Sequence, residues 1–389
     1  MYTIKTLNAI SPVYETVLNM EDYAFDAYAE APDAILVRSA NMHEMELPES
    51  VMCVSRAGAG VNNIPLEALA ERGVVVFNAP GANANAVKEM TITGMLLASR
   101  KVVDGVQWCK TLSGKGAEVE KLVEKGKGQF VGPELQGKTL GVVGLGAIGV
   151  LVANAGVALG MDVLGFDPYI SVEHAWKLSR SVRHSTSLDE VLKNSDYLTV
   201  HVPLIEATKG MIDAQALSKM KPSAAVLNFA RGGLVDTRAI KDALKAGLLR
   251  AYVTDFPSDE LIGAPGVVCI PHLGASTPES EDNCVRMVAR QTDEYLRWGS
   301  IVNSVNYPDC PLGRCTEPRI AMLHKNVPNV IGSVTQLIAG EGLNIDNMIN
   351  KSRGAYACTV VELDREPSPS LMAKLGALET AYRVRLILP

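Results

Sequence analysis

Short runs rich in β-branched residues alternate with segments of helical period between residues 139 and 272. The runs are bounded by turn-forming residues, which end a strand rather than extend it. This alternation predicts a parallel sheet with helices on both of its faces. The expected strands are residues 141–144, 161–167, 196–203, 224–230, 251–256 and 267–272, and the expected helices include 188–192 and 237–244.

The flanking segments predict two further modules beside a central domain at 96–280. Residues 1–95 mix short strands and helices, enough for a second α/β domain, and residues 281–305 return to it as a long helix. Residues 306–317 are rich in proline and cysteine without periodicity, so a linker is expected there. Residues 318–389 read as strand, helix, two strands, helix and strand, which predicts a C-terminal βαββαβ domain.

Length and charge limit the class of protein. A chain of 389 residues is too long for one ordinary core, and 47% hydrophobic with 21% charged residues is a globular composition. The net charge of −6 gives no general attraction for nucleic acid or an anionic membrane. No secretory signal is visible at the N-terminus. Residues 139–161 lack charge but contain six glycines, so a strand, a turn and a buried helix are expected there rather than a membrane span.

The seven cysteines are odd in number and mostly scattered, which favours the reduced thiols of a cytoplasmic protein. Cys310 and Cys315 are the one close pair. No second pair or histidine cluster completes a zinc site, so no metal is expected and a redox role for the pair is left open.

A glycine motif marks a nucleotide site. Gly144, Gly146 and Gly149 form a GxGxxG between an apolar strand and an apolar helix. These glycines permit a tight turn, close approach of a pyrophosphate and close helix packing, so the domain is expected to be a doubly wound Rossmann domain. Asp167 ends the next strand, 18 residues past Gly149, where a carboxylate would bind ribose and repel a 2′-phosphate. NAD is therefore favoured over NADP.

Three chemically suited side chains follow strands on the nucleotide side. Arg231 could bind a carboxylate, His272 could accept a hydroxyl proton, and Glu260 could favour the imidazolium and raise the pKa of His272. Each has an ordinary structural interpretation when taken alone. Together they match the needs of oxidising a 2-hydroxy acid.

Across residues 30–300 the chain resembles the D-2-hydroxyacid dehydrogenase family, through GLGAIG, HVPLIEATKGMI, NFARGGLVD and PHLGAST. The resemblance implies an NAD-dependent oxidoreductase whose catalytic residues are Arg231, Glu260 and His272. Leu261 stands where the family usually has proline, which makes Glu260 the least secure of the three. The resemblance further implies a cofactor site lined by Gly144, Gly146, Ala147, Ile148, Gly149, Asp167, Val202, Pro203, Thr208, Ala230 and Asp255.

The C-terminal block resembles an ACT domain, a small module that commonly binds amino acids. Family members that carry one oxidise D-3-phosphoglycerate to 3-phosphohydroxypyruvate in serine synthesis, and this activity is implied here. The same resemblance implies L-serine as effector, at His324, Asn326 and Asn344. Asn329 replaces a usual glycine, and asparagine tolerates the left-handed backbone expected there.

An anionic substrate needs cations in the domain at 1–95, which the resemblance makes the substrate-binding domain. Its implied substrate residues are Arg38, Ser39, Arg56 and Asn83. Two other readings stay open: a reductase of hydroxypyruvate, glyoxylate or 2-oxoglutarate, and a non-catalytic NAD(H)-sensing regulatory protein. The resemblance also implies a homodimer or homotetramer.

Overall fold

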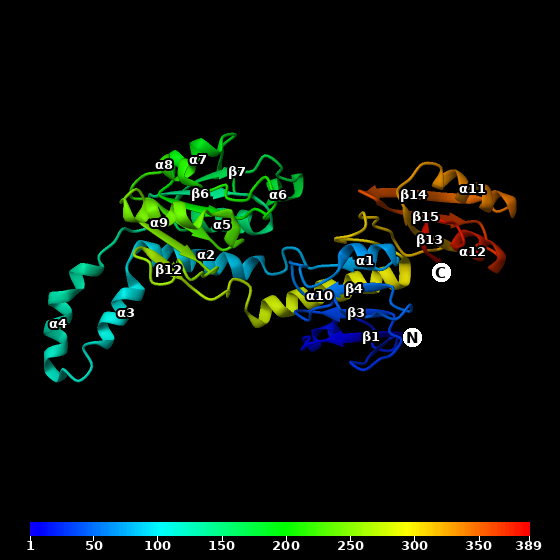
Figure 1. Ribbon diagram of the computed structural model, residues 1–389, viewed down its shortest axis with the longest axis horizontal. Coiled ribbons are helices and arrows are strands. Elements are labelled where there is room, and N and C mark those ends of the chain that lie inside the picture. Colours follow the sequence, from blue (N-terminus) through cyan, green and yellow to red (C-terminus); the bar gives the residue numbers. More distant parts are fainter. The chain divides into compact units, whose positions relative to one another are not determined.

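The computed structural model describes residues 1–389 and divides them into two compact units (Figure 1). Unit 1 comprises residues 1–83 and 281–389, and unit 2 comprises residues 84–280. Each unit is described by itself. None of the helices combines the length and the apolarity that crossing a bilayer requires.

Unit 2 is built on a seven-stranded parallel sheet in the order β12-β11-β10-β9-β6-β7-β8. Successive strands add on one side of β6 as far as β8 and then on the other side from β9 to β12. The strand order thus reverses between β6 and β9, which is the switch point where doubly wound sheets bind nucleotides. The predicted Rossmann sheet is thereby confirmed. Its strands are β6 (Thr139–Val143), β7 (Asp162–Phe166), β8 (Arg183–His184), β9 (Tyr197–Val200), β10 (Ala225–Asn228), β11 (Ala251–Thr254) and β12 (Val267–Cys269).

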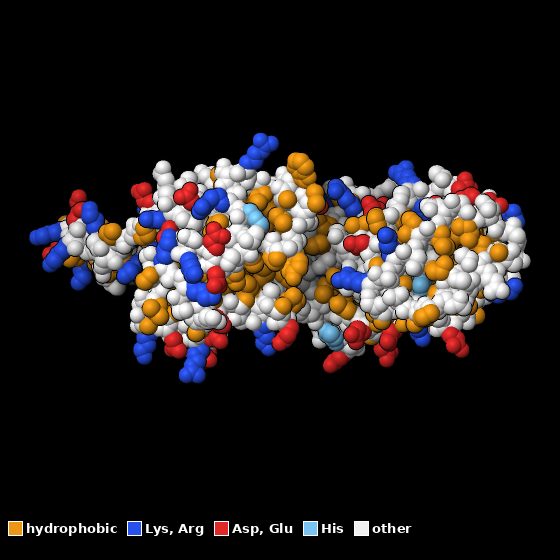
Figure 2. Space-filling model, turned by 90° about the horizontal axis from the view of Figure 1, so that it is seen from above, with side chains coloured by type: hydrophobic (Ala, Val, Ile, Leu, Met, Phe, Trp, Pro, Cys, Tyr) orange, Lys and Arg blue, Asp and Glu red, His pale blue; other side chains and the backbone are white.

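Helices cover this sheet, and one pair of helices leaves it. The uncharged stretch at 139–161 is β6, a glycine turn and a helix, as predicted. In Figure 1 two helices, α3 and α4, project from the rest of unit 2 as an arm, and Figure 2 shows charged side chains of both signs at its tip. The helices of unit 2 are α2 (Ala84–Ser99), α3 (Val102–Lys110), α4 (Val119–Gly126), α5 (Ala147–Ala158), α6 (Val172–Lys177), α7 (Leu188–Asn194), α8 (Ala214–Ser218) and α9 (Thr237–Lys245).

Unit 1 contains a five-stranded parallel sheet in the order β2-β1-β3-β4-β5. β3, β4 and β5 are short and almost entirely buried, as expected of strands covered on both faces, whereas most residues of β1 and β2 are half-buried. The long helix α10 (Pro278–Trp298) packs on this sheet through Val288, Ala289 and Leu296. The other elements are β1 (Tyr2–Leu7), β2 (Tyr23–Phe25), β3 (Ala34–Val37), β4 (Cys53–Arg56), α1 (Leu66–Glu71) and β5 (Val75–Phe77).

The C-terminal block has the predicted βαββαβ order and forms an antiparallel sheet in the order β14-β15-β13-β16. Asn329 precedes its first helix with φ +68°, so the left-handed backbone expected at this position is present. The elements are β13 (Arg319–Lys325), α11 (Val330–Gly340), β14 (Ile345–Arg353), β15 (Tyr356–Leu363), α12 (Pro369–Gly376) and β16 (Ala381–Ile387).

The C-terminal block is not a separate compact unit. Leu323 and Val360 belong to the same hydrophobic cluster as Leu36, Phe77 and Leu296. Arginine side chains add hydrogen bonds to backbone carbonyls: Arg385 donates to the carbonyl oxygens of Tyr295 and Leu296, and Arg353 to that of Ser304. The block therefore shares a core with the parallel sheet of unit 1.

One predicted domain boundary and the description of 306–317 as a linker need correction. Residue 95 lies inside α2, and the division falls between residues 83 and 84, because α2 packs against α5 and against β10 and β11 of unit 2. The segment 306–317 lacks helix and strand, as predicted, but it is packed rather than free. Tyr307 is fully buried and donates from its hydroxyl to the carbonyl of Ala70, and Cys310 pairs with Ile301 in a β-bridge.

Candidate active site

The glycine loop after β6 has the geometry that its sequence predicts. Gly144 has φ +90°, and a Cβ there would lie 2.6 Å from the carbonyl oxygen of His201. A Cβ on Gly149 would lie 1.8 Å from the carbonyl oxygen of Gly144. Gly146 faces open space at the start of α5, so a phosphate can approach its backbone and the helix N-terminus.

Asp167 is tied to this loop. It follows β7, and its Oδ2 accepts a hydrogen bond from the backbone N–H of Leu145 at 2.8 Å. Its Oδ1 accepts another from the N–H of Tyr169 at 2.8 Å. The carboxylate is thus held beside the glycine turn, the position from which an acidic residue reaches ribose in such domains.

The other expected cofactor residues lie at or beside strand ends of the same sheet edge. Val202 packs near Gly144, and Thr208 donates from Oγ1 to the carbonyl oxygen of Pro203 at 2.6 Å, closing the loop after β9. Ala147 and Ile148 lie in the first turn of α5, Ala230 lies two residues after β10, and Asp255 directly follows β11.

Arg231, Asp255 and His272 follow three adjacent strands, β10, β11 and β12. The charges of His272 and Arg231 both act on the pKa of Asp255. Burial raises the pKa of Asp255, and the backbone N–H of Gly274, His272 and Arg231 oppose that rise. The ring of His272 packs against the ring of Phe256 with 4.8 Å between their centroids. His272 is nevertheless exposed to solvent. The sheet therefore brings together a cation, a carboxylate and an imidazole.

Buried polar contacts fix the turn that carries Arg231. Asn228 is fully buried and donates from Nδ2 to the carbonyl oxygen of Arg231 at 2.9 Å. Thr254, on the neighbouring strand, donates to the carbonyl oxygen of Asn228 at 2.9 Å. The Arg231 guanidinium itself is exposed and donates to the carbonyl oxygen of Ala230.

Glu260 does not lie where its predicted role requires. Its Oε2 lies 3.5 Å from Nζ of Lys241 on α9, and its side chain is 65% exposed. No hydrogen bond joins it to His272. The acidic side chain whose charge is coupled to His272 is instead Asp255, which was expected only as a cofactor contact.

Asp255 also carries an unused acceptor. Its Oδ2 accepts from the backbone N–H of Gly274 at 3.1 Å, whereas the buried Oδ1 has no partner. A buried oxygen without a donor is uncommon and points to a ligand N–H. Together with the open face of Gly146, this orphan oxygen shows that the residues present fit a dinucleotide at the sheet edge.

The predicted substrate residues lie at the carboxyl ends of β3, β4 and β5 in unit 1. Arg38 forms a 2.5 Å ion pair with Glu281, and Arg56 donates from Nε to the carbonyl oxygen of Arg38 at 3.1 Å. The backbone N–H of Ser39 donates to Oδ1 of Asn8. Asn83 ends the loop that follows β5. The two arginines therefore lie together, with one acidic neighbour.

The predicted effector residues are not assembled within one chain. His324 is 2% exposed, and its ring contacts the hydroxyl of Thr359 at 2.7 Å and the carbonyl of Lys325 at 2.8 Å, so both nitrogens are used internally. Burial lowers the pKa of His324. Asn326 lies at the same end of the sheet. β13 and β14 are both antiparallel to β15 and therefore run in the same direction. Asn344 precedes β14 and thus lies at the opposite end of the sheet, beside Asp364.

The cysteine pairing also differs from the spacing in sequence. All seven cysteines are free thiols. Cys310 makes its side-chain hydrogen bond with Cys358 of β15, not with Cys315, and both partners are buried. The internal contact of Cys310 thus links the irregular segment to the C-terminal sheet.

Comparisons with known proteins agree with this geometry. Residues 92–274 match the family profile described as "D-isomer specific 2-hydroxyacid dehydrogenase, NAD binding domain". This segment covers the whole sheet of unit 2 with the glycine loop and His272. Residues 92–274 are therefore similar to the NAD-binding domain of this family.

Curated relatives extend the similarity. The chain is 35% identical over 321 residues to D-3-phosphoglycerate dehydrogenase of Methanocaldococcus jannaschii, covering 80% of this chain and 58% of that protein. It is 35% identical over 285 residues to the enzyme of the same name from Bacillus subtilis, covering 71% and 52%. The chain thus spans about half the length of the curated relatives it matches.

Solved structures share the fold. The apo D-mandelate dehydrogenase of Rhodotorula graminis aligns with TM-score 0.67 and 24% identity, over 80% of this chain and 99% of that one. An NAD⁺-bound 3-phosphoglycerate dehydrogenase of Entamoeba histolytica aligns with TM-score 0.61 and 24% identity, over 78% and 98%. At this identity the likeness supports the fold.

Proposed function

We propose that this protein uses NAD to oxidise D-3-phosphoglycerate to 3-phosphohydroxypyruvate, the first step of phosphorylated L-serine synthesis. One structural observation carries the chemistry: Arg231, Asp255 and His272 follow adjacent strands at the edge of an NAD-binding domain. Relatives of 34–38% identity that bear the name of this activity support the substrate.

The proposed roles follow from charge and position. The guanidinium of Arg231 binds the substrate carboxylate and polarises the C2 oxygen. A ring nitrogen of His272 accepts the hydroxyl proton while the C2–H electron pair leaves as hydride, and a carbonyl forms at C2. Bound NAD supplies the acceptor for that hydride. Asp255 Oδ1 is the acceptor on this chain that fits a cofactor N–H.

Recognition of the phosphate is proposed for Arg38, Ser39, Arg56 and Asn83. Arg38 and Arg56 supply cations in unit 1, and Ser39 supplies a hydroxyl. Glu281 neutralises part of the charge of Arg38 through its 2.5 Å contact. This ion pair is the observation that favours an unphosphorylated acid as second candidate substrate, such as hydroxypyruvate, glyoxylate or 2-oxoglutarate.

The substrate assignment is tested by following NADH at 340 nm with 3-phosphohydroxypyruvate, hydroxypyruvate, glyoxylate and 2-oxoglutarate. We expect the phosphorylated acid to give the highest kcat/KM. Arg56→Gln is expected to raise its KM more than the KM for hydroxypyruvate. Preference for unphosphorylated acids would overturn the substrate and keep the dehydrogenase. Binding of NADH without turnover of any acid would indicate a sensor of NAD(H).

Assembly into a homodimer or homotetramer is proposed through the α3–α4 arm. The arm and its base expose Val102, Val103, Val106 and Val131, by between 40% and 77%, and such apolar surface is typical of protein contacts. Sedimentation velocity tests this. Val106→Glu is expected to lower the sedimentation coefficient to that of a monomer, whereas Leu248→Glu, at a position after α9 that is 48% exposed, is not.

L-Serine is proposed as an effector bound by the C-terminal domain. Asn326 and Asn344 lie at opposite ends of its sheet, so a site that uses both requires a second copy of the domain. Inhibition of turnover by millimolar L-serine should then disappear in both Asn326→Ala and Asn344→Ala. Inhibition that survives both substitutions would exclude this site.

A further inference from the structure

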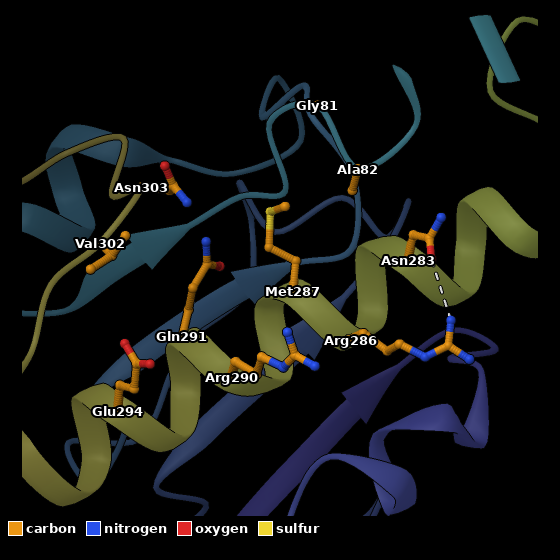
Figure 3. Close-up of a pocket in the computed structure, with 10 residues that line it drawn as sticks. All are labelled: Gly81, Ala82, Asn283, Arg286, Met287, Arg290, Gln291, Glu294, Val302 and Asn303. Carbon is orange, nitrogen blue, oxygen red and sulfur yellow. Dashed lines mark hydrogen bonds between the residues drawn. The ribbon is translucent and has the colours of Figure 1, made fainter. Parts of the chain in front are cut away.

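A pocket of about 490 Å³ lies in unit 1, along the face of α10. Figure 3 shows side chains of α10 meeting the loop at Gly81–Ala82 and the segment at Val302–Asn303. The polar side chains used below, Arg290, Gln291 and Glu294, follow Glu281 of the predicted substrate edge by nine or more residues. That spacing corresponds to about 14 Å or more along the helix. These three side chains therefore lie at the end of the pocket away from Glu281, whereas Asn283 lines the end near it.

Gln291 is the unusual residue in this pocket. It is 5% exposed, and both its amide oxygen and its amide nitrogen are buried without a hydrogen-bond partner. In Figure 3 the amide points away from α10 toward the side on which Gly81 and Asn303 lie. Buried side-chain amides normally form hydrogen bonds. Here the amide nitrogen lacks an acceptor and the amide oxygen lacks a donor.

Two opposite charges flank this amide. Arg290 and Glu294 are spaced i, i+4 on α10, the spacing at which ion pairs form on a helix. Neither side chain forms an ion pair or a hydrogen bond with another group of the protein. Arg286, by contrast, donates to Oδ1 of Asn283 at 3.3 Å. A guanidinium, a carboxylate and an amide thus line one pocket without a partner from the protein.

We propose that this pocket binds a small α-amino acid in its zwitterionic form. The ligand carboxylate pairs with Arg290 and accepts from the Gln291 amide nitrogen. The ligand ammonium donates to the Gln291 amide oxygen and to Glu294. Met287 and Val302 supply the apolar wall for the ligand's side chain. A plain anion would leave the oxygen of Gln291 unpaired and would face Glu294.

The pocket is also placed to influence the predicted substrate edge. Gly81 and Ala82 precede Asn83 directly, and Gly81 has φ +75°, which only glycine adopts easily. A ligand that contacts this loop constrains the backbone that carries Asn83. The binding inference itself does not depend on the proposed reaction.

Met287 provides a local probe. The full-length protein, labelled with ¹³C at methionine methyls and assigned with Met287→Leu, is titrated with glycine, L-alanine and L-serine. Acetate and methylammonium serve as half-ligands. We expect the Met287 methyl to shift with the amino acids and not with either half-ligand at the same concentration. Arg290→Gln and Gln291→Leu should each weaken binding at least tenfold.

Two matched controls keep the result specific. Asn344→Ala, in the C-terminal sheet, and Arg231→Gln, in unit 2, should leave the Met287 shift unchanged. Arg290→Gln alters an exposed side chain, so the test stands even where Gln291→Leu fails to fold. No shift with any amino acid, or a shift that survives Arg290→Gln, would overturn the proposal. Equal affinity for acetate would make the pocket an anion site instead.

Discussion

The guanidinium of Arg319 meets Oε1 of Glu362 at 2.5 Å, and only 2% of the arginine side chain is exposed. The same guanidinium donates to the carbonyl oxygens of Trp298, at the end of α10, and Gly313, in the irregular segment. One buried cation thus ties together three stretches of unit 1. Its charge is balanced by a single carboxylate.

Removal of that carboxylate is expected to be costly. Glu362→Gln leaves Arg319 buried without a counter-charge, which should lower the free energy of unfolding by about 3 kcal/mol. Replacing the pair by Arg319→Met with Glu362→Leu should cost less, since no uncompensated charge remains. Urea unfolding at pH 7 measures both. Equal losses in the two proteins would contradict the charge argument.

The pair also predicts a pH dependence. The hydrogen bond from Arg319 holds the pKa of Glu362 below its usual range. Because the folded pKa lies below the unfolded value, about 4.3, the stabilisation is complete above that value and is lost as pH falls through the folded pKa. The difference in free energy of unfolding between the native protein and Glu362→Gln should therefore become smaller as the pH falls below about 4.3.

His201 supplies a second pH prediction. Burial lowers its pKa to about 4, and its Nδ1 has no partner. The unfolded chain binds a proton near pH 6.5 whereas the folded chain does not, so stability is complete above that pH and falls between 6.5 and 4. The expected loss is about 3 kcal/mol. In His201→Asn the free energy of unfolding, measured by urea unfolding at several pH values, should fall less between pH 6.5 and 4 than in the native protein.

The active-site geometry predicts unequal effects of two substitutions. His272→Asn should lower kcat by about 10²- to 10³-fold, since it removes the proposed proton acceptor. Glu260→Gln should lower it less than about tenfold, because that carboxylate is 65% exposed and faces Lys241. Lys241→Met is the matched control and should resemble Glu260→Gln. An effect of Glu260→Gln as large as that of His272→Asn would show that the glutamate acts on the histidine.

Cofactor choice follows from Asp167. Its carboxylate is anchored by the N–H groups of Leu145 and Tyr169, so it cannot turn away from a 2′-phosphate without losing them. Calorimetric titration should show at least about 100-fold tighter binding of NADH than NADPH. Asp167→Ser with Tyr169→Arg should reverse or remove that preference. Equal affinity in the native protein would refute the role of Asp167.

The sequence predicted the sheet of unit 2 because its signals are local. Gly144 and Gly149 admit no side chain in their turn, and β-branched runs mark the strands on either side. That Arg231 and His272 lie at one edge of the sheet could be predicted because residues that follow parallel strands reach the same edge. Glu260 sits in a loop and its carboxylate faces Lys241 of α9, a contact that no local pattern in the sequence encodes.

Other features depended on packing between distant segments. The end of unit 1 at residue 83 was missed because α2 continues directly from a loop of unit 1 and is assigned to unit 2 only by its contacts with α5. Burial of His324 against Thr359 could not be read from its sequence neighbours. The unpaired amide of Gln291 has no sequence signal, since only its surroundings show that partners are missing.

The single hydrophobic cluster that joins Ile4 and Leu36 to Leu323 and Val360 limits how the chain can be divided. The C-terminal block occupies 72 of the 389 residues by its range 318–389, yet one face of its sheet completes the core of another domain. If the C-terminal block were removed, its apolar face would become exposed to solvent, and so would the part of the unit 1 core that it covers. The block is therefore not an exchangeable cassette, and recombination at residue 317 would have to rebuild both surfaces at once.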